Sequence, residues 1–240
     1  MQVATEHGAE QLGVTVDGVR RVLGGRAVLD GLDLAVPLHG RVGIVGRSGS
    51  GKSTVLALVA GLASPDAGAI SVTGGSALMP QKDCLLPWRS ALDNACLALE
   101  NRGVDRRDAR RRAAELFARV GLAGSEQLRP SQLSGGMRQR VAFVRTLLAD
   151  KEVLLLDEPF GALDAITRGE LQEWLRETLA DEPRTVVLVT HDVEEAIVLC
   201  DQVAVLAGGR IAASFAVDVE PVRTDAAFVE LRERVLEAIK

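Results

Sequence analysis

The sequence predicts an α/β fold with a mostly parallel sheet, a small antiparallel β part and an inserted α-helical part. In both halves of the chain, short apolar runs typical of buried strands recur between helix-forming runs. Runs near the N-terminus alternate apolar and polar residues instead, and residues 84–150 show helical periodicity. Strands of a parallel sheet are buried on both faces, whereas an antiparallel sheet often has one solvated face. The two strand patterns therefore predict two kinds of sheet.

The antiparallel part is expected from the first strands. Apolar and polar residues alternate over Leu12–Asp17 and Leu32–Val36, and Ala69–Val72 fits a further short strand. Between them the apolar run Arg41–Val45 (RVGIV) predicts a buried strand, which a helix over Thr54–Leu62 (TVLALVAGL) follows. This strand and helix are expected to belong to the parallel part.

An amphipathic helix is predicted over Ala109–Val120, where apolar residues recur at spacings of 4, 3, 1 and 3. Its other face carries five arginines: Arg106, Arg107, Arg110, Arg111 and Arg112. Such a cluster could contact nucleic acid. Because the whole chain has a net charge of −5, a solvated helix face is the better interpretation, and we expect no nucleic-acid partner.

The strand pattern returns after Asp150, with apolar runs at 152–156, 185–190 and 203–206. A helix over Ala165–Leu179 separates the first two, and a last helix is predicted over Ala226–Ile239. The predicted helical part thus interrupts an α/β core.

The bulk properties are those of an ordinary globular chain. Its 240 residues are 47% hydrophobic and 25% charged, and none of its apolar runs reaches the roughly 18 residues that span a membrane. The N-terminal segment MQVATEHGAEQLG lacks the basic and apolar regions of a signal peptide. Cys84, Cys96 and Cys200 are far apart, which argues against a disulfide framework or a zinc site and favours a reducing cytosol.

The stretch GRSGSGKST matches G-x-x-x-x-G-K-[ST] and lies between the predicted strand and helix. Successive backbone N–H groups must turn inward to wrap a phosphate chain, and glycine reaches the required dihedral angles without steric cost. A lysine then supplies charge for the β- and γ-phosphates, and a serine hydroxyl is placed to ligate Mg²⁺. A simple glycine-rich turn would need neither. The pattern predicts a P-loop NTPase core whose nucleotide-binding residues are Gly46, Arg47, Ser48, Gly49, Ser50, Gly51, Lys52, Ser53 and Thr54.

Two acids, Asp157 and Glu158, follow the predicted strand at 152–156. In sheets of this kind the carboxyl ends of the strands lie beside the phosphate loop. Asp157 suits a partner of Mg²⁺ through water or through Ser53, and Glu158 could accept a proton from an attacking water. Two acids after a strand are also typical of a solvated turn, but the phosphate loop favours the catalytic interpretation.

A second helix start with anion-binding character occurs in the segment LSGGMRQR, residues 133–140. Ser134 and two glycines open an apolar helix, and together they offer a hydroxyl, unhindered N–H groups and a helix dipole. An ordinary N-cap with a flexible entry would look similar. A shared nucleotide would explain why one chain carries two such helix starts.

These motifs together resemble the ATP-binding-cassette (ABC) transporter ATPases. The residues that carry the resemblance are Gly46–Ser53, LSGGMRQR at 133–140, VLLLDEP at 153–159, GALD at 161–164 and His191 in VTHD. The order matches, the resemblance covers nearly the whole chain, and the eight-residue signature is more specific than the phosphate loop. It implies an ATP hydrolase that uses ATP and Mg²⁺. It also implies a single domain, 1–240, with a nucleotide-binding core at approximately 10–82 and 151–240 and a helical signature subdomain at 83–150.

The resemblance further implies a head-to-tail homodimer with two ATP molecules at the interface. Each ATP would lie between Gly46–Thr54 of one subunit and Ser134, Gly135 and Gly136 of the other. In the family's pattern Glu158 is the general base or water-polariser and His191 contacts the γ-phosphate. Asp164 matches the acid of the loop that crosses the interface. The residues implied to ligate Mg²⁺, directly or through water, are Ser53, Gln81 and Asp157, and Gln81 is also implied to contact the attacking water.

One departure concerns the base. The family usually stacks adenine on an aromatic residue soon after the first strand, a position occupied here by Leu23 in a chain without tyrosine. Apolar contacts from Leu23 and Val28 would replace the stacking, so weak nucleotide affinity or weak base selectivity is expected. Gly161 also stands where serine is common, a change of mild expected effect.

The segment CLLPW at 84–88, the LDN that follows it and the C-terminal LRERVLEAI resemble the importer ATPases for nitrate, sulfonates, taurine and similar small organic solutes. In that family the region after Gln81 helps form a groove for a cytoplasmic helix of the permease, although CLLPW could equally be core packing. The implied partners are a second ATPase subunit, membrane permease subunits and, indirectly, a solute-binding protein. The implied location is peripheral, on the cytoplasmic face of a bacterial membrane. The alternatives are an exporter ATPase or a non-transport ABC ATPase.

Overall fold

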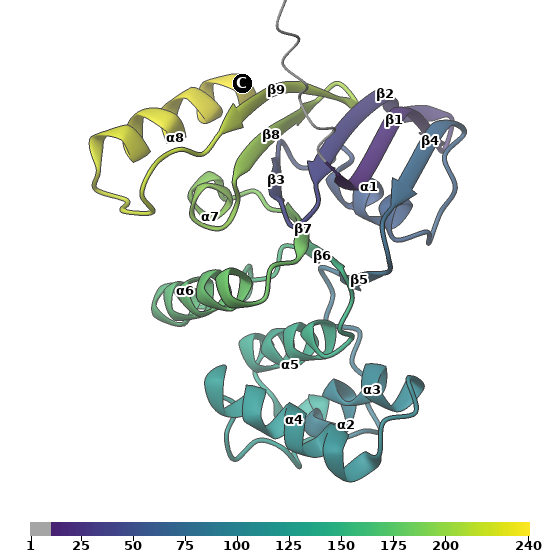
Figure 1. Ribbon diagram of the computed structural model, residues 1–240, viewed down its shortest axis with the longest axis vertical. Coiled ribbons are helices and arrows are strands. Elements are labelled where there is room, and N and C mark those ends of the chain that lie inside the picture. Colours follow the sequence, from purple (N-terminus) through teal and green to yellow (C-terminus); the bar gives the residue numbers. More distant parts are fainter. Residues whose placement is uncertain (1–10) are drawn as a thin grey trace, which may run out of the picture.

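A three-stranded antiparallel sheet forms the first part of the computed structural model, which describes residues 11–240 (Figure 1). Its strands are β1 (Leu12–Leu23), β2 (Arg26–Pro37) and β4 (Ala67–Val72), in the order β2-β1-β4. The alternating pattern located all three, although β1 and β2 run further than predicted, up to a two-residue turn. Residues 1–10, and with them most of the segment predicted not to be a signal peptide, lie outside the described residues.

The second sheet has six strands in the order β5-β6-β7-β3-β8-β9. All neighbours pair in parallel except β8 and β9, which are antiparallel. Every residue of β6 and β7 is buried, as expected for strands covered on both faces. The strands are β3 (Arg41–Val45), β5 (Ser76–Met79), β6 (Val153–Asp157), β7 (Thr185–Val189), β8 (Gln202–Ala207) and β9 (Arg210–Ala216).

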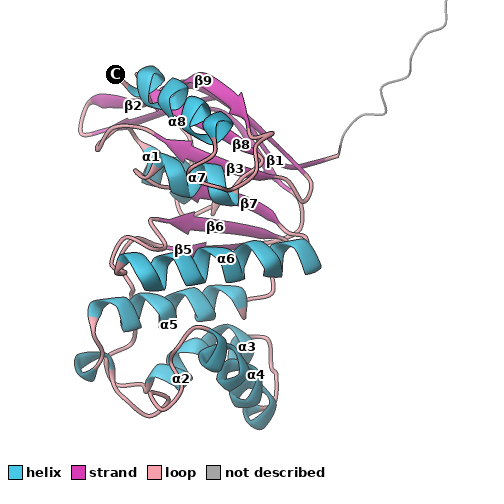
Figure 2. Ribbon diagram, turned by 90° about the vertical axis from the view of Figure 1, so that its left-hand side faces the viewer, coloured by secondary structure: helices cyan, strands magenta, loops and turns pink. Residues whose placement is uncertain are grey.

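Helices cover both faces of this sheet. On one face α1 (Lys52–Val59) packs between the two sheets, in one apolar cluster with β1, β2 and the inner residues of β3 and β7. The other face is covered by α6 (Ala165–Asp181), α7 (Val193–Leu199) and α8 (Ala226–Ile239) (Figures 1 and 2). The predicted mostly parallel sheet between helices is confirmed.

The inserted helices lie between β5 and β6 in the chain and form the lower part of the molecule in Figure 1. They are α2 (Ala91–Ala95), α3 (Leu97–Asn101), α4 (Arg106–Arg119) and α5 (Gly135–Leu147), with a short 3-10 helix at Pro130–Gln132 before α5. The amphipathic prediction for α4 is correct, since Ala109, Ala113 and Phe117 are buried while most of its arginines are exposed. Helix α5 is the link to the sheet, because its residues share one apolar cluster with both α4 and α6.

Some predicted boundaries were wrong. The helix predicted over Thr54–Leu62 is α1, which begins two residues earlier, at Lys52, and ends at Val59. The strand predicted at 152–156 is β6, which begins and ends one residue later, and Asp157 lies at its carboxyl end as predicted. The edge strands β5 and β9 were not predicted. All three cysteines are free thiols, and within residues 11–240 no helix combines the length and apolar character needed to cross a bilayer.

Candidate nucleotide and catalytic site

The phosphate loop connects the carboxyl end of β3, a central strand, to the start of α1. Glycine is required at two of its positions. A Cβ on Gly46 would lie 2.5 Å from the carbonyl oxygen of Leu206. Gly51 caps α1 with a φ of 105°, and a Cβ there would also lie 3.0 Å from Cγ1 of Val28. The loop is therefore held against the sheet and β2 at distances that side chains would prevent.

Lys52 lies over this loop. Its Nζ donates hydrogen bonds to the carbonyl oxygens of Gly46 at 2.8 Å and Arg47 at 3.1 Å. Burial lowers the pKa of Lys52, and the charges of Glu158 and Asp157 partly offset that shift. The side chain of Arg47 donates to the carbonyl oxygens of Ile239 and Lys240 instead, so its guanidinium faces the end of α8.

The other predicted loop residues differ in exposure. Gly46 is buried, Ser50, Gly51 and Thr54 are half-buried, and Ser48, Gly49 and Ser53 are exposed. The Ser50 hydroxyl is a buried polar atom without a hydrogen-bond partner in the described part of the chain, and so is Oδ1 of Asp157. Buried polar atoms are normally satisfied, so two such atoms at this loop fit a site that takes a polar ligand.

The pKa of Asp157 reflects both its burial and its neighbours. Burial raises the pKa of Asp157, and a hydrogen bond from Ser53 and the charge of Lys52 partly offset that shift. A buried carboxylate beside a serine hydroxyl and an ammonium group suits a hydrated divalent cation, because oxygen donors are the ligands that Mg²⁺ prefers. The donor set therefore fits Mg²⁺.

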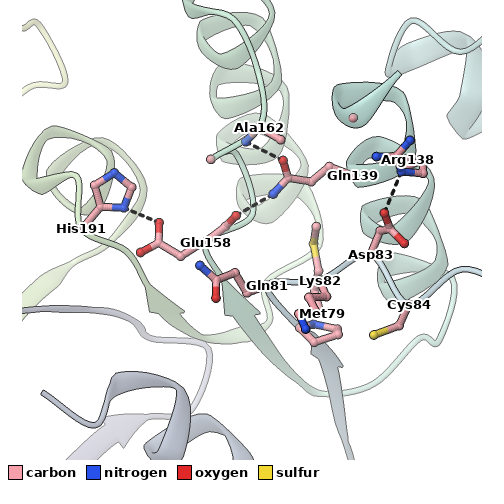
Figure 3. Close-up of a pocket in the computed structure, with 13 residues that line it drawn as sticks. Met79, Gln81, Lys82, Asp83, Cys84, Arg138, Gln139, Glu158, Ala162 and His191 are labelled. Atoms are coloured by element: carbon pink, nitrogen blue, oxygen red, sulfur yellow. Dashed lines mark hydrogen bonds and ion pairs between the residues drawn. The ribbon is translucent and has the colours of Figure 1, made fainter. Parts of the chain in front are cut away.

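The three residues predicted to be catalytic line one cleft of about 650 Å³ (Figure 3). Gln81 enters it from the loop after β5, Glu158 from the loop after β6 and His191 from the loop after β7. The carboxyl ends of three neighbouring strands thus bring together residues that are far apart in the sequence.

Glu158 and His191 form a contact within this cleft. Oε2 of Glu158 lies 2.7 Å from Nδ1 of His191. The carboxylate side chain is only 13% exposed, whereas the imidazole is 73% exposed. The backbone of Glu158 has a φ of 51°, which is uncommon for a residue with a side chain, and its N–H donates to the carbonyl oxygen of Val189 at 2.8 Å.

The residues predicted to contact a second subunit lie at exposed helix starts. Ser134 caps α5 and accepts a hydrogen bond from the Met137 N–H at 3.2 Å. Gly135 is exposed and Gly136 half-buried. Asp164 caps α6, and hydrogen bonds from Thr167 lower its pKa. Within the chain Ser134 is thus an N-cap, the alternative that the sequence left open beside a contact with a second subunit.

The two residues predicted to contact adenine lie differently. Val28 contacts the phosphate loop at Gly51 and is half-buried. Leu23 ends β1 beside the hairpin turn and is 45% exposed. The structure thus places Val28 against the loop and Leu23 at the hairpin turn.

Sequence reasoning missed two buried polar residues of this region. Gln139, on α5, donates to the carbonyl oxygen of Glu158 and accepts from the Ala162 N–H. Glu195, on α7, accepts a hydrogen bond from the Thr190 hydroxyl beside His191. The signal available for Gln139 was its place within an otherwise apolar helix face, because a polar residue there must find a partner.

Fold and site define a P-loop nucleotide hydrolase with a helical insertion before the acidic strand end. The family model of ABC transporters matches residues 29–161. Aliphatic sulfonates import ATP-binding protein SsuB 1 of Rhodococcus jostii is 50% identical over 201 residues, which cover 81% of this chain and 79% of that protein. Formylaminopyrimidine import ATP-binding protein ThiZ of Halalkalibacterium halodurans is 47% identical over 177 residues, which cover 73% of this chain and 71% of that protein.

A solved structure supports the same family assignment. The dimeric, post-hydrolysis ATP-binding cassette MJ0796 bound to ADP and Pi superimposes with a TM-score of 0.80 at 27% identity, covering 86% of this chain and all of that one. The chain belongs to the ABC transporter family. It is an ABC-type ATP hydrolase and an ATP-binding subunit of the importer type, as the motifs predicted.

Proposed function

We propose that the chain powers an importer of aliphatic sulfonates or a similar small organic solute. ATP hydrolysis is supported chiefly by one observation. Three side chains, those of Gln81, Glu158 and His191, line one cleft at the carboxyl edge of the sheet. The solute class is supported by the 50% identity to an aliphatic sulfonates import protein. The 47% identity to a formylaminopyrimidine import protein makes that solute the competing candidate.

In this proposal Glu158 accepts the proton of the water that attacks the γ-phosphate. Its carboxylate is largely withdrawn from bulk solvent yet lines the cleft, where a base meets the water it activates. His191 contacts the γ-phosphate with an imidazole that the 2.7 Å contact to Glu158 orients. The N–H groups of residues 46–54 and the Lys52 ammonium bind the phosphate chain.

Mg²⁺ would be held by Ser53, Gln81 and Asp157, the last through water. When bound, Mg²⁺ would supply positive charge that offsets the negative charge of the phosphates. The buried Asp157 oxygen without a hydrogen-bond partner in the described residues supports this assignment.

We further propose that two copies form a head-to-tail homodimer in which Ser134, Gly135, Gly136 and Asp164 of one subunit contact the ATP site of the other. The exposure of both helix starts is consistent with such contacts, and the dimeric cassette MJ0796 provides a precedent. Closure of the dimer on ATP and reopening after hydrolysis would drive the permease. Each copy would act as a single ATPase domain with residues 83–150 as its helical subdomain.

The permease would bind near Trp88, whose side chain is 68% exposed at the start of the helical insertion. Trp88 is thus available to a partner, whereas Leu85 of the same segment is buried in the core. A solute-binding protein would deliver the solute on the other side of the membrane. The ATPase would then lie peripherally on the cytoplasmic face of a bacterial membrane.

The test is ATPase activity in a reconstituted complex with the permease and the solute-binding protein. A short alkanesulfonate should stimulate hydrolysis, whereas the carboxylate of equal chain length should not. Stimulation by a formylaminopyrimidine alone would replace the proposed solute. A complex that hydrolyses ATP but responds to none of these compounds would contradict the proposal.

A further inference from the structure

Gln139 makes two hydrogen bonds to the loop that carries the catalytic acid (Figure 3). Its Nε2 donates to the carbonyl oxygen of Glu158 at 2.7 Å, and its Oε1 accepts from the N–H of Ala162 at 2.8 Å. The residue is only 7% exposed. An uncharged amide donates through its nitrogen and accepts through its oxygen, so one side chain makes both bonds. Both polar atoms of the Gln139 amide are thus hydrogen-bonded to the segment 158–162.

The first of these bonds acts on an uncommon backbone conformation. Glu158 has a left-handed φ of 51°, and such conformations persist only where the surroundings determine them. Its N–H is held by Val189 on β7 and its carbonyl by Gln139 on α5. The backbone on both sides of the acid is therefore fixed by neighbouring elements, and one of these is a helix of the insertion.

The same helix extends to the other parts of the site. At its exposed start Ser134 caps the first turn. Arg138, the residue before Gln139, forms an ion pair with Asp83 at 2.9 Å. Asp83 lies two residues after Gln81 in the chain. Helix α5 is thus joined to the backbone of Glu158 through Gln139 and to the loop of Gln81 through Arg138.

We propose that Gln139 is a positioning residue for Glu158, tying the backbone of the acid to α5. Because the start of α5 is the segment proposed to contact the ATP of the partner subunit, Gln139 links the geometry of one hydrolytic site to occupancy of the other. This inference rests on the proposed role of Glu158. It assigns Gln139 no contact with the nucleotide.

The test compares two variants of Gln139 in the full-length protein. Gln139→Met keeps the length of the side chain but makes neither bond, and should lower kcat about ten- to hundredfold with little change in the KM for ATP. Gln139→Glu keeps the shape, but its carboxylate opposes the carbonyl oxygen of Glu158. Once protonated it can again donate to that oxygen while accepting from Ala162. The kcat of Gln139→Glu relative to wild type should therefore rise as pH falls.

Two controls distinguish this pH dependence of kcat from a general effect of placing a charge in the protein interior. Gln172 on α6 is also buried and accepts a hydrogen bond from Arg223. Gln172→Glu should keep a constant ratio to wild type over the same pH range, and so should Gln139→Met. The charged groups that line the cleft, Lys82, Asp83, Arg138, Glu158 and His191, are present in wild type and variants alike, so their effects largely cancel in the ratio.

A flat ratio for Gln139→Glu, or a wild-type kcat in Gln139→Met, would overturn the inference. If Gln139→Met does not fold, the pH dependence of Gln139→Glu decides alone. Glu158→Gln is measured alongside. Full turnover in Glu158→Gln refutes the proposed base, whereas an inactive Glu158→Gln beside unaffected Gln139 variants refutes only the positioning role.

Discussion

The two glycine-containing helix starts of this chain, at α1 and α5, differ in what surrounds them. The start of α1 follows a central strand, carries the buried ammonium of Lys52, and has Asp157 and Glu158 close enough to affect that group's pKa. The start of α5 is exposed, and its Ser134 hydroxyl already caps the helix. The first has the charges to bind a triphosphate, while the second offers N–H groups and a hydroxyl to a ligand bound elsewhere. The difference is what the proposed shared site requires, namely one binding site and one contact that completes another.

The largest expected effect tests the α1 side. Glu158→Gln should lower kcat by about 10²- to 10⁴-fold, because it removes the proton acceptor, and should leave ATP binding intact and trap an ATP-bound dimer. Steady-state hydrolysis and size-exclusion chromatography with ATP measure both. Glu152→Gln, next to the other end of the same strand, serves as the matched control and should hydrolyse ATP normally. Wild-type turnover in Glu158→Gln would remove the assignment.

The next effect tests the α5 side. Ser134→Arg should lower kcat by about 10²- to 10³-fold, since it replaces a phosphate contact with a bulky side chain, while ATP still binds the subunit's own loop. Hydrolysis and nucleotide binding are measured on the same preparation. Ser131→Arg, an exposed change three residues earlier, should be silent. Normal activity in Ser134→Arg would refute a shared site.

A smaller effect concerns the buried acid behind His191. Burial raises the pKa of Glu195 from 4.5 to about 8. Between these values the folded protein holds a proton that the unfolded chain has lost, so this group lowers the free energy of unfolding as pH rises through that window. Glu195→Gln should remove this dependence and be more stable than wild type above pH 8, by at most a few kcal/mol.

Urea unfolding at pH 5, 7 and 9 measures this dependence. Glu170→Gln, an exposed change on α6, should follow wild type at each pH. Equal stability differences between Glu195→Gln and wild type at pH 5 and pH 9 would show that the Glu195 carboxyl does not keep its proton in the folded state.

The smallest effect tests how much of the ATP affinity of the α1 site comes from contacts to the base rather than to the phosphates. Leu23→Trp should strengthen ATP binding by about 1 kcal/mol, roughly fivefold, because it restores a ring on which adenine can stack. Titration with ATP and with inorganic triphosphate separates base from phosphate contacts, and only ATP should gain. Leu12→Trp, at the other end of β1, should change neither. An equal gain for both ligands would mean that the ring does not contact the base.

Sequence alone located the phosphate loop, the acidic strand end and the signature helix, because their chemistry requires particular residue types at fixed local spacing. It did not find the edge strands β5 and β9. The first has four residues, and the second alternates half-buried and exposed residues that include three alanines.

Contacts between distant segments were also beyond reach. Gln139 meets Glu158 only because α5 packs beside the loop after β6. Glu194 and Glu195 are adjacent acids of one helix, yet Glu194 pairs with Arg232 while Glu195 is buried. Nothing in the local pattern distinguishes them, since burial is decided by the packing of α7 on the sheet.

The claim that one binding site and one completing contact come from different subunits is tested most directly by mixing two inactive variants. In a mixed dimer of Glu158→Gln and Ser134→Arg, one site combines the intact Glu158 of one subunit with the intact Ser134 of the other. Random pairing should restore roughly a quarter of wild-type hydrolysis, because half of the dimers are mixed and each has one intact site. A mixture that stays as inactive as its two parents would contradict the account.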